Sequence, residues 1–229
     1  MKLHRFIGEF DLSKKEIEIT NPENIKQIKD ILRLKVSEIL ILSDGKEISV
    51  EASITSISPR KILCIVSKMK KENETTRKVN LYLAILKKEN FELAVQKAVE
   101  CGIMSITPII TERTIKTGLN TARLEKIIRE ASEQSGRDIV PTLSPILDFK
   151  NALVDASGEK IIFHLGAKEY EPEKNAKDVS IFIGPEGGFT EKEIGLAKAS
   201  EFLVASLGPL TLRGETAAII GTYRAVYGV

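Results

Sequence analysis

The segment Ile181–Thr190, IFIGPEGGFT, decides the fold because it joins a buried strand to a helix through a glycine-rich turn. It continues a mostly apolar stretch that starts at Val179 and is interrupted by Ser180, and such a stretch is typical of a strand covered on both faces. Thr190 and Glu193 form the S/T-x-x-E capping box, which marks the start of a helix. A strand, a turn and a helix in this order predict one unit of an α/β fold.

The same alternation of strand and helix extends over residues 79–229. Apolar runs predict strands at Val79–Leu86, Ile103–Ile110, Lys160–Leu165, Val179–Gly184 and Phe202–Leu207. Helical periodicity predicts helices at Asn90–Cys101, Thr121–Ser135, Thr190–Ser200 and Glu215–Tyr227. We therefore expect a mostly parallel sheet with helices on both faces.

Residues 1–67 have a different sequence pattern, with short β segments separated by turn residues. The expected strands are Lys15–Ile19, Glu38–Leu42, Glu47–Glu51, Ala52–Ile57 and Ile62–Val66, with one short helix near Glu23–Leu34. This spacing suggests a small barrel. We expect a β domain at residues 1–70, a polar linker at 71–78 and an α/β domain at 79–229.

The 229 residues are 42% hydrophobic, enough for a core, and their net charge of +2 excludes an arm-like polycation. That total hides an uneven distribution, since residues 1–78 contain 16 Lys and Arg against 12 Asp and Glu, and the remainder is net acidic. A cationic cluster lies at Arg60, Lys61, Lys68, Lys70, Lys71, Arg77 and Lys78. It is either a solvated linker or an edge that faces phosphates.

Cys64, Cys101, His4 and His164 are too few and too far apart for a Cys/His zinc site, so no metal is expected. Two unclustered cysteines fit a reducing compartment. No apolar run approaches the 18 residues of a membrane span, and we expect a cytoplasmic protein.

The turn Gly184–Gly188 is a candidate site because glycines let the backbone approach a ligand closely. It follows a strand, and ligands of open α/β sheets bind at the carboxyl ends of strands. The pattern is neither G-x-G-x-x-G nor a phosphate-binding P-loop, so a dinucleotide or a nucleoside triphosphate is not expected. The alternative is a plain connection with turn glycines.

The segment Leu207–Ala217 repeats the arrangement of strand, Gly-Pro loop and helix. Glu215 is explained by the favourable helix dipole, whereas Arg213 is unfavourable at a helix start and is the better functional candidate. We expect the two Gly-Pro loops to lie side by side, so that one ligand touches both. The strand end at His164 is a third candidate position, although a lone histidine is usually structural.

These residues resemble the ribosomal RNA small subunit methyltransferase E family, SPOUT-class enzymes that methylate N3 of a uridine in 16S rRNA. The resemblance covers most of the chain. It rests on His4–Phe6, Ile31–Arg33, Gln96–Gly102, Pro108, Glu112–Arg113, Glu133–Arg137 with Pro141, Gly184–Gly188 and Leu207–Ala217. The sequence departs from the family pattern at Gln27, usually His, at Leu210, often Arg, and at Gly214, usually Thr.

The resemblance implies a PUA-like N-terminal barrel, a C-terminal domain with a deep trefoil knot, a homodimer, and S-adenosylmethionine held by the knotted loops. The implied cofactor-binding residues are Leu165, Gly166, Ile183, Gly184, Pro185, Glu186, Gly187, Gly188, Leu207, Gly208, Pro209 and Leu212. Arg213 is the expected catalytic residue that stabilises the uracil anion, and Glu186 is a second candidate, as proton acceptor or orienting group.

Contacts with 16S rRNA are expected from basic residues on both domains: Arg5, Arg33, Lys61, Lys70, Lys71, Arg113 and Arg137. Two alternatives remain open. The first is an RNA-binding or ribosome-assembly protein with a vestigial cofactor pocket, and the second is a SPOUT methyltransferase that acts on another RNA nucleotide.

Overall fold

The structure, a computed structural model, describes residues 3–71, 77–115 and 117–229, with no side-chain detail for Lys70, Lys71 and Lys88. The chain forms two compact units. The N-terminal unit consists of residues 1–74 and 132–140, and the C-terminal unit consists of residues 75–131 and 141–229. The return of residues 132–140 to the N-terminal unit has no counterpart in the sequence patterns.

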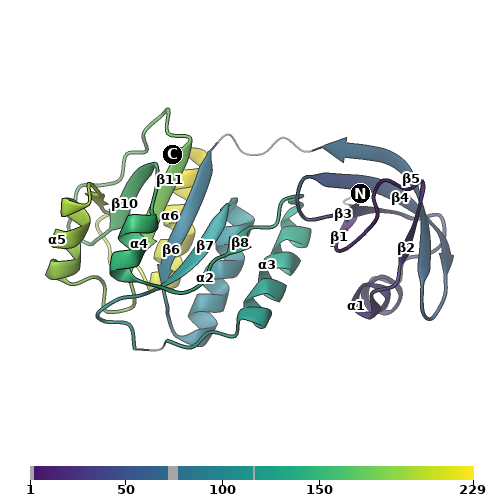
Figure 1. The fold of residues 1–229 in the computed structure, drawn as a ribbon, viewed down its shortest axis with the longest axis horizontal. Coiled ribbons are helices and arrows are strands. Elements are labelled where there is room, and N and C mark those ends of the chain that lie inside the picture. The colour runs from purple at the N-terminus through teal and green to yellow at the C-terminus, as the bar shows by residue number, and fades with distance from the viewer. Residues whose placement is uncertain (1–2, 72–76, 116) are drawn as a thin grey trace. The chain divides into compact units, whose positions relative to one another are not determined.

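The C-terminal unit is built on a parallel β-sheet (Figure 1), as the apolar strands predict. Its spatial order is β12-β10-β11-β6-β7-β8, with β9 also paired to β7, and every pairing is parallel. The strands are β6 (Lys78–Ala84), β7 (Ser105–Ile110), β8 (Thr142–Leu143), β9 (Leu147–Asp148), β10 (Glu159–Phe163), β11 (Asp178–Ile183) and β12 (Leu203–Ala205).

Helices cover both faces of this sheet. They are α2 (Lys88–Cys101), α3 (Thr121–Ser135), α4 (Phe149–Asp155), α5 (Glu191–Ala199) and α6 (Gly214–Tyr227). Helix α6 packs on α2, β6 and β11. On the opposite face, Phe149 of α4 and Ile194 of α5 share a core with Phe182 of β11. The Phe182 ring stacks on Tyr82 with centroids 4.4 Å apart, so β6 and β11 are fixed together at the centre of the sheet.

The N-terminal unit is a five-stranded sheet with the order β1-β3-β4-β5-β2. Its strands are β1 (His4–Ile7), β2 (Glu16–Ile19), β3 (Ile39–Ser43), β4 (Ile48–Ile57) and β5 (Ile62–Lys71). One short helix, α1 (Pro22–Lys26), continues as a π-helix over Gln27–Ile31. The core is almost wholly aliphatic: Ile19, Ile28, Leu40, Leu42, Ile54 and Ile62 are fully buried.

Several expected elements differ in extent. Residues 48–57 form one strand, with register shifts after Glu51 and after Ile54, rather than two strands. Strand β5 extends to Lys71, pairing Lys68 with Glu51, so part of the cationic cluster is strand. Polar side chains are tolerated there because an antiparallel strand needs only one buried face. Elements β8, β9 and α4 were not predicted, because residues 142–155 contain no long apolar run.

The two cysteines are free and lie in different units. Cys64 is fully buried in the N-terminal core, and this burial raises the pKa of its thiol to about 11. Burial also raises the pKa of the half-buried Cys101. Both thiols are therefore protonated near neutral pH, and neither has the lowered pKa of a reactive cysteine.

Candidate functional site

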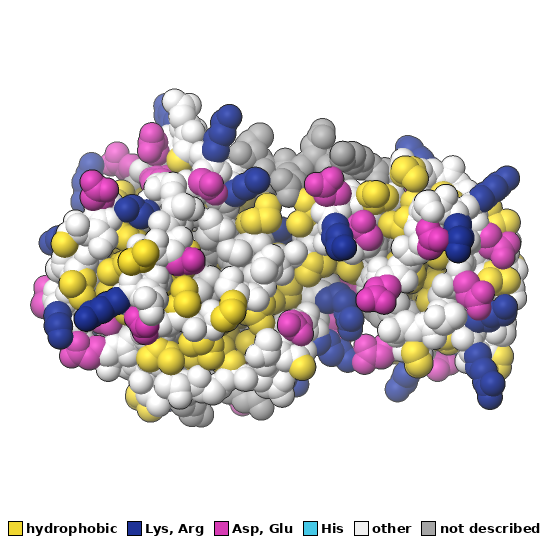
Figure 2. Space-filling model, viewed as in Figure 1, with side chains coloured by type: hydrophobic (Ala, Val, Ile, Leu, Met, Phe, Trp, Pro, Cys, Tyr) yellow, Lys and Arg dark blue, Asp and Glu magenta, His cyan; other side chains and the backbone are white. Residues whose placement is uncertain are grey.

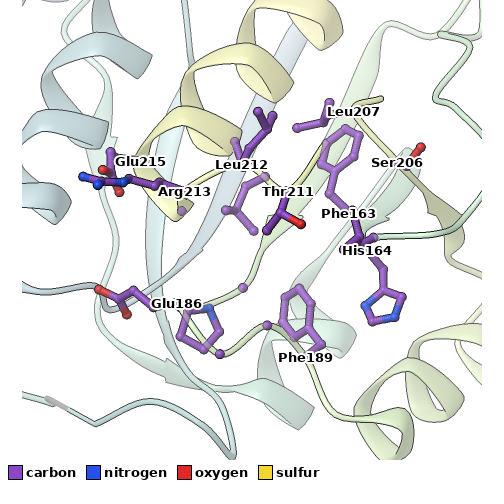
Figure 3. Close-up of a pocket in the computed structure, with 18 of the residues that line it drawn as sticks. Phe163, His164, Glu186, Phe189, Ser206, Leu207, Thr211, Leu212, Arg213 and Glu215 are labelled. Atoms are coloured by element: carbon purple, nitrogen blue, oxygen red, sulfur yellow. The ribbon is translucent and has the colours of Figure 1, made fainter. Parts of the chain in front are cut away.

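A cavity of about 690 Å³ opens at the carboxyl ends of the parallel strands (Figure 3). This volume is within the range typical of small-molecule sites. The walls come from the loops that follow β10, β11 and β12, with further residues after β6 and β7. A site at this edge was expected because ligands of open α/β sheets bind there.

The spatial order of the strands corrects one expectation. The two Gly-Pro loops follow β11 and β12, which are not neighbours, because β10 pairs with both of them. Both loops nevertheless line this one cavity, as expected, and the end of β10, with Phe163, His164 and Leu165, completes its wall. His164 is tied into the sheet, since its backbone N–H donates to the Ala205 carbonyl over 2.8 Å.

The loop after β11 is closed by hydrogen bonds at each step. The Gly188 N–H donates to the Pro185 carbonyl over 2.8 Å, and Gly188 takes the left-handed φ of +68° that favours glycine. Arg113 donates from Nη1 to the Gly187 carbonyl over 2.6 Å. The capping box at Thr190 is present as predicted, with reciprocal bonds to Glu193. These hydrogen bonds hold the loop in place at the cavity wall.

Glu186 lies on the rim of the cavity and is exposed. Its Oε1 accepts a hydrogen bond of 3.0 Å from the backbone N–H of Lys87, at the start of α2. This bond ties the loop after β11 to the end of β6. The bond helps to hold Glu186 in place, and it leaves the other carboxylate oxygen for solvent or ligand.

The loop after β12 places Arg213 as the N-cap of α6, without a side-chain cap bond. The guanidinium is exposed and lines the cavity. Gly214 packs closely, since a Cβ atom there would lie 2.8 Å from Cδ2 of Leu86. This contact limits the size of the side chain at residue 214, where threonine is usual in the family pattern. The start of α6 can then lie against the ends of β6 and β11.

Glu215 is the unexpected residue of the site. Its side chain lines the cavity and is only 7% exposed, and its Oε2 is buried without a hydrogen-bond partner among the described residues. The sequence suggested only a favourable interaction with the helix dipole. A buried carboxylate oxygen without a donor is costly, so a donor from a ligand would stabilise this arrangement.

The structure brings most of the expected cofactor-binding residues to the cavity wall. Lining residues among them are Leu165, Ile183, Gly184, Pro185, Glu186, Gly187, Gly188, Leu207, Gly208 and Leu212. Gly166 and Pro209 are adjacent to lining residues but are not part of the wall. Both catalytic candidates, Arg213 and Glu186, line it.

The expected RNA-binding residues differ in their exposure and in their partners. Arg113 lines the cavity, Arg33 and Lys61 are exposed, and Lys61 pairs with Glu18 over 3.6 Å. Arg137 is half-buried. The side chains of Lys70 and Lys71 lie outside the described residues. On the face shown in Figure 2, Lys and Arg side chains are interspersed with Asp and Glu rather than gathered in one patch.

Arg5 does not occupy the surface position expected of a phosphate contact. It is buried in the N-terminal unit, where its guanidinium forms an ion pair with Asp138. Its side chain is 7% exposed, and that of Asp138 is 2% exposed. Glu133 binds the same unit by accepting a 2.8 Å hydrogen bond from the Ile7 N–H. The segment Glu133–Arg137 thus contributes to the N-terminal unit, beyond the helix end predicted at Gly136.

Sequence patterns missed several lining residues. The cavity wall also includes Lys87, Asn90, Phe163, Phe189, Ser206, Leu210 and Thr211. Phe163 had the signal of a core residue, since it lies in an apolar run, whereas Phe189 stands alone between Gly188 and Thr190. Lys87 and Asn90 could have been found from their position directly after a strand, because β6 ends in the same sheet edge.

In the part of the chain that the structure describes, no group of three or more His, Cys, Asp or Glu side chains could hold a metal ion. Likewise, none of the described helices is long and apolar enough to cross a membrane.

Residues 72–224 match the family model of the RNA methyltransferase domain. The ribosomal RNA small subunit methyltransferase E of Rickettsia conorii is 32% identical over 96% of this chain and 93% of its own length. The chain belongs to the ribosomal RNA small subunit methyltransferase E family. A family member from Mesomycoplasma hyopneumoniae is 36% identical over 68% of the chain and 72% of its own length.

A solved structure of the same family has a similar fold. Ribosomal RNA small subunit methyltransferase E from Neisseria gonorrhoeae, bound to S-adenosyl methionine, has a TM-score of 0.87. It is 29% identical, and the match covers 96% of this chain and 95% of that one. The likeness to the methyltransferase E family therefore includes both units.

Proposed function

We propose that this protein is an S-adenosylmethionine-dependent methyltransferase that methylates N3 of a specific uridine in the 16S rRNA of the small ribosomal subunit. The observation that carries the proposal is the cavity at the carboxyl edge of the sheet, with Arg213 and Glu215 in its wall, in a chain of the methyltransferase E family. The S-adenosyl methionine bound to the gonococcal relative supports the choice of cofactor.

The residues of the cavity fit this cofactor. Aromatic and aliphatic side chains, among them Phe163 and Leu207, offer apolar surface for an adenine ring. The loops around Gly184 and Gly208 offer backbone donors and acceptors without side chains in the way. We assign cofactor binding to the loops that follow Phe163, Ile183 and Ala205. Bound there, S-adenosylmethionine supplies an electrophilic methyl group.

Arg213 supplies the electrostatic part of the reaction. Uracil N3 carries a proton and becomes a good nucleophile only as negative charge develops on the ring. A guanidinium held at the cavity wall stabilises that charge, and removing such a donor costs about 100- to 1,000-fold in turnover. The hydrogen bond from the Lys87 N–H favours an orienting role for Glu186 over proton transfer.

RNA capture is assigned to the accessible cations. Arg33 and Lys61 present charge on the N-terminal unit, and Arg113 presents it at the cavity rim. Arg137, Lys70 and Lys71 remain in the proposed set, while the buried pairing of Arg5 makes it a structural residue. Replacing any one cation that binds a phosphate should reduce the slope of binding affinity against salt by about one unit.

The family likeness also supports a finer description of the architecture. We assign the N-terminal unit, predicted as residues 1–70, as a PUA-like RNA-docking barrel, and the C-terminal unit, predicted as residues 79–229, as a SPOUT domain with a deep trefoil knot. The ends of the predicted linker 71–78 belong to strands, Lys71 to β5 and Lys78 to β6. Homodimerisation and a cytoplasmic location belong to the same proposal, since ribosome assembly takes place there.

The test is mass spectrometry of 16S rRNA from a strain that lacks the protein. We expect one 3-methyluridine to disappear and to return when the gene is restored, but not when Arg213→Ala is supplied. Disappearance of a different modified nucleotide would keep the methyltransferase class and change the substrate. An unchanged modification map, together with no affinity for S-adenosylmethionine, would leave an RNA-binding protein with a vestigial pocket.

A further inference from the structure

One carboxylate oxygen of Glu215 is buried and has no hydrogen-bond partner in the part of the chain that the structure describes. Glu215 lies in the first turn of α6 and is 7% exposed, and the buried oxygen is its Oε2. Taking a carboxylate out of water without a donor is among the more costly arrangements in a protein. The fold tolerates this cost at a cavity wall, where a ligand can supply the missing donor.

The helix dipole alone does not account for this placement. A dipole at a helix N-terminus attracts an acidic side chain equally well when that side chain remains in water. Glu191 shows this in the same molecule, since it lies in the first turn of α5, is exposed and does not line the cavity. Glu215 also lies in the first turn of its helix, as the second residue of α6, but it is buried at the cavity wall.

Figure 3 shows that the labelled side chains divide the cavity into two ends. Glu186, Arg213 and Glu215 gather at one end, and Phe163, His164 and Leu207 lie at the other. The aromatic end suits the adenine of the cofactor, so the charged end is left for the reacting groups. Glu215 and Arg213 both come from the start of α6, so acceptor and cation are presented together.

We infer that Glu215 is a catalytic residue that accepts the N3 proton of the target uracil, an inference that rests on the proposed function. Arg213 then stabilises the charge that develops on the ring, and Glu186 keeps its place in the loop. The two carboxylates of the cavity differ as this division requires: one is exposed and hydrogen-bonded by Lys87, and the other is buried with an oxygen that lacks a donor.

Proton transfer and methyl transfer together conserve atoms and electrons. The N3–H bond breaks and its proton passes to a carboxylate oxygen of Glu215. The electron pair on N3 forms a bond to the methyl carbon, and the bond from that carbon to the sulfonium sulfur breaks with its electron pair left on sulfur. The products are 3-methyluridine, a neutral thioether and one proton, which leaves Glu215 for solvent after product release.

The experiment compares wild type with Glu215→Gln, using 16S rRNA or small subunits from a strain that lacks the protein. Single-turnover methyl transfer should fall by about 100-fold or more, which is the usual contribution of a positioned general base. Binding of S-adenosylhomocysteine, measured by calorimetry, should stay within a few-fold. Raising the pH should restore much of the variant's rate, because hydroxide then removes the N3 proton without a protein base.

Two further variants act as controls. Glu191→Gln removes a carboxylate from the first turn of α5 and should leave transfer, binding and pH profile unchanged. Glu215→Asp keeps a base on a shorter arm, and it should give an intermediate rate with the wild-type pH profile. It also provides the test if the glutamine variant does not fold.

Several outcomes would overturn the assignment. These are an unchanged transfer rate in Glu215→Gln, a defect of the same size at every pH, or a loss of S-adenosylhomocysteine affinity that matches the loss of rate. The last result would make Glu215 a cofactor ligand. If wild type itself transfers no methyl group to this RNA, the proposed function fails instead, so the two failures are distinguishable.

Discussion

The two Gly-Pro loops of the cavity are built in opposite ways. The loop after β11 is closed by a Gly188–Pro185 hydrogen bond, by the Arg113 side chain and by the capping box at Thr190. In the loop after β12, residues 207–212 form no hydrogen bond with any described residue. The first loop satisfies its polar groups internally, and the second leaves them available.

Under the proposed function, this difference separates a supporting wall from a reacting wall. Internal hydrogen bonds fix the position of the first loop before any ligand binds, which is how a scaffold limits the entropy that binding must remove. The second loop ends at Arg213 and Glu215, which have no salt bridge to any described residue. Both side chains are therefore available to a ligand in the cavity. Changes in the second loop should therefore affect chemistry, and changes in the first should affect stability.

The largest expected effect is in the second loop. Arg213→Ala should lower single-turnover methylation by about 100-fold or more, because the charge that develops on the base loses its donor. Cofactor affinity and the free energy of unfolding should change little, since the guanidinium is exposed and caps no helix. Rapid-quench methylation with calorimetric titration measures both. An active Arg213→Ala protein would show that the reacting wall has been wrongly located.

The next effect is at the packed junction of the two walls. Gly214→Ala places a Cβ atom against Leu86, 2.8 Å from Cδ2 in the present geometry. Overpacking of this kind costs about 1–3 kcal/mol in the free energy of unfolding. Urea unfolding of Gly214→Ala, Leu86→Ala and the double variant measures the coupling. Strictly additive costs would show that the contact does not restrict residue 214.

A smaller effect is expected from the cap of the first loop. Thr190→Ala removes the acceptor for the Glu193 N–H and should lower the free energy of unfolding by about 1 kcal/mol. Thr190→Ser keeps the acceptor and serves as its control. Chemical denaturation should separate the two variants, while the methylation rate at saturating cofactor stays the same. A rate defect in Thr190→Ala alone would mean that the first loop is more than a support.

The smallest effect is expected at Glu186. Glu186→Gln retains an oxygen that can accept from the Lys87 N–H, so the methylation rate should stay within about threefold of wild type. Glu186→Ala removes that acceptor and should mainly weaken cofactor binding. A 100-fold loss of turnover in Glu186→Gln would transfer the proton-accepting role from Glu215 to Glu186.

The sequence predicts which residues form strands and helices better than it predicts which of these elements lie next to each other. The apolar run before Gly184 and the capping box at Thr190 are local signals, and both are present in the structure. The position of β10 between β11 and β12 is not local, because no periodicity records which parallel strands pair. For the same reason the sequence could point to Arg213, because a cation interacts unfavourably with the dipole at a helix start. It could not point to Glu215, whose burial depends on packing between α6 and its neighbours.

The charge pattern of the sequence predicts only some of the exposed cations, because exposure also depends on contacts between residues far apart in the chain. Arg5 and Arg33 are equal as cations in the sequence, yet one is buried in an ion pair and the other is exposed. What separates them is Asp138, more than 130 positions after Arg5 in the chain. Long-range partners of this kind decide whether a cation faces solvent.

The return of residues 132–140 to the N-terminal unit affects how the protein is made. During synthesis the first 74 residues leave the ribosome long before Asp138 does, so Arg5 cannot pair with Asp138 until the chain has almost doubled in length. The N-terminal unit therefore cannot mature in the order of its sequence, as domains usually do. A fragment that stops at residue 74 would enclose the Arg5 guanidinium without Asp138, and such fragments should be aggregation-prone unless residues 132–140 are supplied in trans.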